Sequence, residues 1–167
     1  MYTREPSTDF ELIDEWDLGV GWLAHPEERG MRASHAVVFD DGVWIIDPLD
    51  APGIDEHIVA LGEVVGVAVL SSMHARDAHH FGDRYDVPVY VPDGMDGLSN
   101  GLDTPHPRYL DEFPARGVRI LARHPFPGFD EANLFHEPTQ TLYIGDSLGT
   151  TPWHTVGQET LGAQALL

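Results

Sequence analysis

A histidine-rich segment is the part of this sequence whose residue types could do chemistry. It follows an apolar run and reads Ser71-Ser72-Met73-His74-Ala75-Arg76-Asp77-Ala78-His79-His80. Imidazole and carboxylate groups bind metal ions and transfer protons near neutral pH. The chain has no cysteine, which excludes disulfides, thiolate zinc sites and thiol nucleophiles. Any metal ion must therefore be held by His, Asp or Glu side chains.

A serine nucleophile is a weaker interpretation of the same segment. Ser71 and Ser72 precede His74 and Asp77, but groups two or three residues apart in one loop rarely converge into a triad. The chain contains no Gly-x-Ser-x-Gly motif, and without lysine it has no Walker-type phosphate loop.

The elements that must position the segment lie on both sides of it. Two β-branched runs around an Asp-Asp-Gly turn predict a β-hairpin over residues 34–47, which Pro48 ends. An amphipathic helix is expected over 52–61, a buried strand over 64–70, a helix over 76–85 and a buried strand over 87–91. Strands alternating with helices in this way predict parallel pairing.

The remaining segments complete one domain over residues 1–167. Alternating apolar and acidic residues predict a strand over 10–16, and a further strand is expected over 118–122. A second hairpin is expected over 132–144, and a weak helix after Gln158. Residues 93–114 are rich in Gly, Pro and Asp and predict a long irregular loop whose role the sequence leaves open.

The order of these elements resembles the metallo-β-lactamase superfamily. The first hairpin ends in Ile46-Asp47, the His-rich loop follows a buried strand, Pro127-Gly128 precedes the second hairpin, and that hairpin closes on Gly145-Asp146. The resemblance covers roughly residues 10–150. It implies an α/β fold, an αββα sandwich with mixed sheets, shortened here at the C-terminus.

The resemblance also implies a set of metal ligands. The family's His-x-His-x-Asp-His motif aligns its first and last His with His74 and His79, and the family's bridging Asp aligns with Asp146. These three residues are the predicted ligands of one zinc ion. Asp77 or His80 could replace one of them if the loop shifts by one residue. His154 is the one candidate for the family's final His, at a spacing that does not match.

Two positions depart from the family motif. Arg76 stands where the second His is expected, and a guanidinium has no lone pair with which to bind a cation. Ala78 stands where the Asp is expected, so a second metal ion would lack its carboxylate. Arg76 could instead pair with Asp47 or Asp146 and replace the ion. Arg76 and Asp77 are therefore the candidate catalytic residues.

Two functions follow from the resemblance. The first is a metal-dependent hydrolase of an ester, thioester or lactone-type bond, with one zinc ion. The second is a non-catalytic relative that holds no metal and binds a ligand or partner, with Arg76 in place of the ion. Fold alone does not decide between them.

Composition restricts the partners and the location. The chain carries 28 acidic residues against nine basic ones, all of them Arg, and a net charge of −19. The acids are spread along the whole chain, which favours a halophilic protein over an acidic tail. No basic patch is available for nucleic acid, and no apolar run is long enough to cross a membrane. We expect a cytoplasmic protein with a small-molecule substrate or ligand, and a homodimer through an exposed sheet edge.

Overall fold

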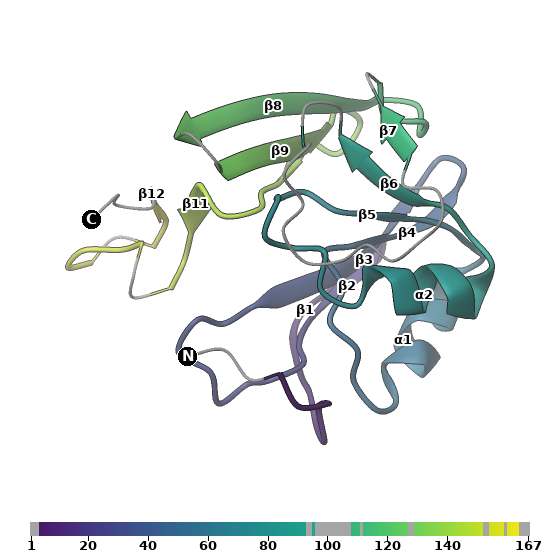
Figure 1. Ribbon diagram of the computed structural model, residues 1–167, viewed down its shortest axis with the longest axis horizontal. Helices are drawn as coiled ribbons and strands as arrows, with labels where there is room; N and C mark the ends of the chain where they lie inside the picture. The colour runs from purple at the N-terminus through teal and green to yellow at the C-terminus, as the bar shows by residue number, and fades with distance from the viewer. Residues whose placement is uncertain are drawn as a thin grey trace.

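A computed structural model describes residues 4–92, 95, 108–110, 112–126, 129–151, 154–158 and 160–163. Within these ranges the chain is a mixed α/β protein with several sheets and two short helices (Figure 1). None of the described helices is long and apolar enough to cross a membrane.

The largest sheet has seven strands in the order β1-β2-β3-β4-β5-β6-β7. Strands β1 to β4 pair in antiparallel fashion, and β4 to β7 pair in parallel. The strands are β1 (Glu11–Trp16), β2 (Gly19–Leu23), β3 (Ala33–Phe39), β4 (Gly42–Ile46), β5 (Val64–Ala68), β6 (Val89–Pro92) and β7 (Arg108–Leu110). The parallel part arises because helices connect β4 to β5 and β5 to β6, as the sequence predicts.

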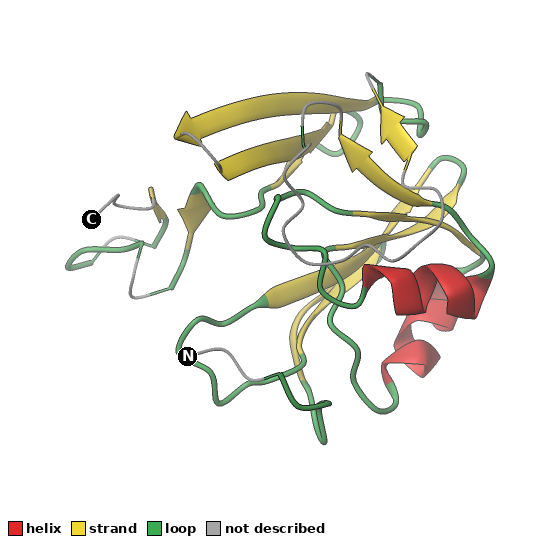
Figure 2. Cartoon of the chain, viewed as in Figure 1, coloured by secondary structure: helices red, strands yellow, loops and turns green. Residues whose placement is uncertain are grey.

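Both helices lie on one face of this sheet (Figure 2). Helix α1 (Ile54–Leu61) contributes buried Ile54 and Ile58, and α2 (Ala78–Tyr85) contributes buried Ala78 and Phe81. Residues that alternate along the parallel strands point towards them, because successive side chains of a strand face opposite sides. These are Val43, Ile45, Val67, Val69, Val89 and Val91.

A second sheet packs against the opposite face. It has the order β10-β9-β8 and is built from β8 (Val118–Phe126), β9 (Phe129–His136) and β10 (Thr141–Tyr143). Trp44 fills the space between the sheets; its ring contacts Phe113 at a centroid separation of 4.4 Å. A Cβ atom at Gly66 would lie 2.6 Å from that ring, so the tryptophan requires glycine on the neighbouring strand.

A third, two-stranded sheet joins β11 (Leu148–Gly149) to β12 (Gly162–Ala163). The weak helix predicted after Gln158 is therefore wrong at the described residues Gly162 and Ala163, which form a strand. Within the described residues the layers are helix, sheet and sheet. The second helical layer of the expected αββα sandwich stays a prediction.

Candidate functional site

One cleft brings together residues from distant parts of the chain. Its volume is about 2030 Å³, and its lining includes Asp47, His74, Arg76, Asp77 and Asp146. These residues lie at the ends of β4 and β5 and in the turn after β10. The carboxyl ends of neighbouring parallel strands meet at one sheet edge, which places the first four residues together.

Asp47 ends β4 and is fixed from several directions. Its φ of 47° is left-handed, a conformation that aspartate tolerates better than most residues. Its backbone N–H donates to the carbonyl of Ala68 at 2.9 Å, and its Oδ1 accepts from the N–H of Leu70 at 2.7 Å. The hydroxyl of Ser34 donates to its carbonyl at 2.9 Å. The second carboxylate oxygen of Asp47 is thereby aimed at one point in the cleft.

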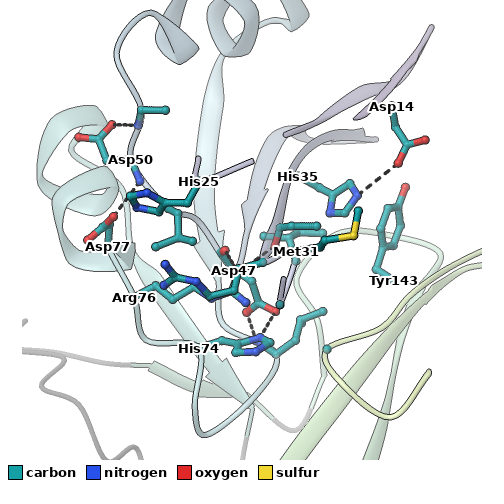
Figure 3. A pocket seen from close by; sticks show the side chains of 18 of the residues that line it. Asp14, His25, Met31, His35, Asp47, Asp50, His74, Arg76, Asp77 and Tyr143 are labelled. Atoms are coloured by element: carbon teal, nitrogen blue, oxygen red, sulfur yellow. Dashed lines mark hydrogen bonds and ion pairs between the residues drawn. The ribbon is translucent and has the colours of Figure 1, made fainter. Parts of the chain in front are cut away.

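His74 lies at that point, beside Asp47 (Figure 3), and a second carboxylate, that of Asp146, lies against its other ring nitrogen. Its Nδ1 is 2.8 Å from Oδ2 of Asp47, and its Nε2 is 3.1 Å from Oδ2 of Asp146. The His74 side chain is 10% exposed, whereas that of Asp146 is 29% exposed. The Ser71 hydroxyl also donates to Oδ2 of Asp146, at 3.2 Å. Of the three side chains in contact, Asp47, His74 and Asp146, it is therefore Asp146 that faces the cleft.

The two carboxylates change the protonation of His74. Burial is the largest single influence and disfavours the imidazolium, as does the nearby Arg76, but Asp47 and Asp146 together outweigh them and raise the pKa of His74. Burial also disfavours the charged form of Asp146 and would raise the pKa of this carboxyl. The contacts with His74, the charge of Arg76 and the Ser71 hydrogen bond outweigh burial and lower the pKa of Asp146. The arrangement favours a charged imidazolium between two carboxylates.

Arg76 lies beside this group with a left-handed φ of 38°. Its Nη1 donates to the backbone carbonyls of Ala33 and Asp47, both at 2.8 Å. These bonds go to main-chain oxygens at the ends of β3 and β4 rather than to the Asp47 carboxylate that the sequence suggested as a partner. Arg76 thus brings a fixed positive charge next to His74 and Asp146.

The other predicted residues have different surroundings. Asp77 precedes α2 and its Oδ2 accepts the N–H of Asp50 at 2.8 Å, which joins the loop after β4 to the start of the helix. His79 does not line the cleft, and its buried Nδ1 has no hydrogen-bond partner within the described residues. Its ring packs on His80 at 3.8 Å, and His80 does reach the cleft. The structure therefore brings His74 and Asp146 together without His79.

Three contributors were undervalued or missed by sequence reasoning. Asp47 was considered in the sequence only as the end of the first hairpin and a partner for Arg76, whereas its carboxylate contacts His74. His154 lines the cleft, and its Nε2 lies 3.1 Å from the carbonyl oxygen of Asp146. Glu131, on β9, accepts hydrogen bonds from the turn that carries Asp146. No motif marks Glu131, and its neighbour Asp130 is also acidic, so the sequence carries no signal that sets Glu131 apart.

The donor set can be tested against the zinc ion that the resemblance implies. Two ligands of a tetrahedral zinc lie roughly 3.4 Å apart, close to the separation of His74 Nε2 and Asp146 Oδ2. A catalytic zinc, however, takes three protein ligands. In the described part of the chain, no group of three or more His, Asp or Glu residues is arranged to hold a metal. The described residues therefore do not form the three-ligand site of a catalytic zinc.

Comparisons with known proteins find similarity to solved structures. No protein-family model matches the chain, and no curated protein matches it. Among solved structures, the chain is similar to a crystal structure of a metallo-beta-lactamase from Staphylococcus aureus subsp. aureus COL, at 13% sequence identity and a TM-score of 0.47. The match covers 78% of this chain and 38% of that one, so this chain spans well under half the length of the structure it matches.

Proposed function

We propose that this chain is a metallo-β-lactamase-like protein that binds a small molecule in its cleft without a metal ion. The observation that carries the proposal is the group formed by Asp47, His74 and Asp146, in which each ring nitrogen of His74 lies against a carboxylate. The positive charge that a metal ion would supply comes here from the imidazolium and from Arg76. In this proposal the cleft binds a ligand but does not activate water through a metal.

Backbone strain supports a binding role for the cleft. Five described residues other than glycine have left-handed φ angles, and three of them, Met31, Asp47 and Arg76, line the cleft. Such conformations cost roughly 1–3 kcal/mol each and cluster at ligand-binding and catalytic sites.

The cleft also carries apolar side chains that are exposed. They are Trp16, Met31, Met73 and Leu142, each 36% exposed or more, and they come from four separate segments. Thioether and aromatic side chains form adaptable contact surfaces for apolar ligand groups. The lining also holds eight acidic residues against four arginines. A ligand with an apolar body and a positively charged head group fits these surroundings best.

The four methionines allow a direct test. Met31 and Met73 line the cleft, whereas Met95 is 2% exposed and lies outside it. We expect benzylammonium to shift the ¹³C methyl resonances of Met31 and Met73 and to leave that of Met95 unchanged. Benzyl alcohol and phenylacetate carry the same ring with a neutral or negative head group and should bind more weakly. If none of the three probes shifts Met31 or Met73 at millimolar concentration, the proposal is wrong.

A second candidate function is the metal-dependent hydrolase of an ester, thioester or lactone-type bond. One observation favours it: Asp47 lies against Nδ1 of His74 and directs Nε2 towards Asp146. Carboxylates hold metal-binding imidazoles in this way. The missing third ligand within the described residues is the reason that it ranks second.

Elemental analysis separates the two functions. After incubation with excess zinc and dialysis, we expect well under one zinc ion per chain, both in the wild type and in His74→Ala. His57→Ala, on α1 and outside the cleft, is the matched control. One zinc ion per chain that is lost in His74→Ala and kept in His57→Ala would instead support the hydrolase.

A further inference from the structure

Strand β9 carries two buried polar side chains next to the candidate site. Glu131 is 1% exposed and Asn133 is 4% exposed. A buried carboxylate is costly unless its oxygens accept hydrogen bonds, so its contacts indicate what holds it there.

These contacts are the backbone amides of one turn. Oε1 of Glu131 accepts the N–H of Asp146 at 2.7 Å and the N–H of Ser147 at 2.9 Å. Oδ1 of Asn133 accepts the preceding N–H, that of Gly145, at 3.3 Å. Three successive amides therefore point at β9, two of them at Glu131 and one at Asn133.

The turn approaches Glu131 closely because residue 145 is glycine. A Cβ atom at Gly145 would lie 3.2 Å from both Cγ and Oε1 of Glu131. A larger residue at this position would require the turn or the Glu131 side chain to shift by a few tenths of an ångström.

The same strand holds the loop that carries His74. Ser71 forms a β-bridge with Glu131, and the N–H of Ala132 donates to the carbonyl of Leu70 at 2.7 Å. The N–H of Ser72 donates to the carbonyl of Asp130 at 2.9 Å, and the N–H of Asp130 donates to the Ser72 hydroxyl at 3.1 Å. Both loops of the site are thus anchored on neighbouring residues of β9.

We propose that Glu131 is the positioning residue that holds the Asp146 carboxylate against His74. It acts through the backbone of the turn and does not touch the cleft, since it is absent from the lining. This deepens the proposed function, because Asp146 is the carboxylate of the group that faces a ligand. The position of Asp47 is set by β4 and by the residues after β5 instead. Glu131 therefore affects the contact at Nε2 of His74 and not the contact at Nδ1.

The proposal can be tested because the two ring nitrogens of His74 contact carboxylates that are held by different parts of the chain. In ¹⁵N-histidine-labelled protein in molar KCl at pH 5, where the imidazole is protonated in every variant, and without ligand, we expect Glu131→Ala to shift the Nε2 resonance of His74 and to leave that of Nδ1 unchanged. Exchange protection of the Asp146 and Ser147 amides should fall about 10- to 100-fold, because each loses a hydrogen bond to a charged acceptor. Glu131→Gln keeps an acceptor oxygen and should restore both signals. Glu137→Ala removes an exposed acid at the end of the same strand and serves as the control for charge.

Glu131→Asp is a second, milder variant that keeps the test possible if Glu131→Ala does not fold. It keeps the charge but shortens the side chain by one methylene, and it should produce the same split between Nε2 and Nδ1. A shift of both nitrogens, a shift of neither, or a Glu131→Gln variant as altered as Glu131→Ala would overturn the assignment. Because no ligand is present, the result is independent of whether the cleft binds benzylammonium.

Discussion

Replacing His74 by alanine is expected to lower the free energy of unfolding by about 3–5 kcal/mol. The imidazole is buried between the carboxylates of Asp47 and Asp146. Removing it leaves two like charges that face each other without the cation between them. Asp47 cannot move towards solvent, because the N–H of Leu70 and the surrounding backbone hold it. Urea unfolding, followed by tryptophan fluorescence, measures the loss.

The size of this loss should depend on pH. The raised pKa of His74 contributes stability that is complete below its unfolded value of about 6.5 and is lost as pH rises through the folded value. The lowered pKa of Asp146 contributes stability that is present above about 3.9 and is lost as pH falls through the folded value. The difference between wild type and His74→Ala should therefore be largest between about pH 4 and 6.5.

His57→Ala supplies the control for a histidine that has no buried ion pair. His57 makes an edge contact with Phe10 at 5.7 Å, and its loss should change stability by about 0.5 kcal/mol or less. If His74→Ala is no less stable than His57→Ala, or if the difference is the same at pH 5 and pH 9, the charged group described above does not exist.

Raising the salt concentration is expected to stabilise the protein strongly. A net charge of −19 repels itself in the compact state, and the Debye length falls from about 10 Å at 0.1 M salt to about 3 Å at 1 M. We expect the thermal midpoint to rise by on the order of 10 °C between 0.1 M and 2 M KCl, which corresponds to a few kcal/mol at this chain length. Scanning calorimetry measures the shift.

Sucrose at matched osmolality separates screening of charge from a general effect of excluded solute. Sucrose is uncharged, so it should raise the midpoint far less than KCl if repulsion between carboxylates is the cause. A midpoint at 0.1 M KCl equal to or above that at 2 M KCl would show that the chain is not adapted to salt. Salt adaptation, the cytoplasmic location and the homodimer stay predictions.

Much of the fold could be predicted because its strands are apolar and its turns carry distinctive residues. The hairpin around Asp40 and Asp41, the parallel strands β5 and β6 and both helices occur within a few residues of the predicted ranges. Strand β2 was missed, because Gly19-Val20-Gly21 lowers the strand signal of a segment that is nevertheless fully buried. At Gly19 a Cβ atom would lie 2.3 Å from the Trp16 ring, so glycine is needed there for packing and not for a turn.

The candidate site could be predicted only in part. The pairing of His74 with Asp146 follows from the order of motifs, and the structure brings these two side chains together. The role of Asp47 could not be predicted from the sequence, because its left-handed backbone and its contact with His74 depend on the conformation of the loop after β5. Glu131 stayed hidden for the same reason, since a carboxylate on a strand signals nothing until its backbone donors are known. The assignment of His79 as a zinc ligand stays a prediction, and the turn at 127–128 lies outside the described residues.

The two sides of His74 come from parts of the chain that are made at different times. Asp47 and His74 are 27 residues apart and belong to the first half, which contains the parallel strands β4 and β5. Asp146 follows Ser71 by 75 residues and reaches the imidazole only when the last hairpin docks. During synthesis the N-terminal half leaves the ribosome before Asp146 does, and domains generally fold as units. The group of Asp47, His74 and Asp146 is therefore complete only after the segment up to Asp146 has been made and has folded against the first half.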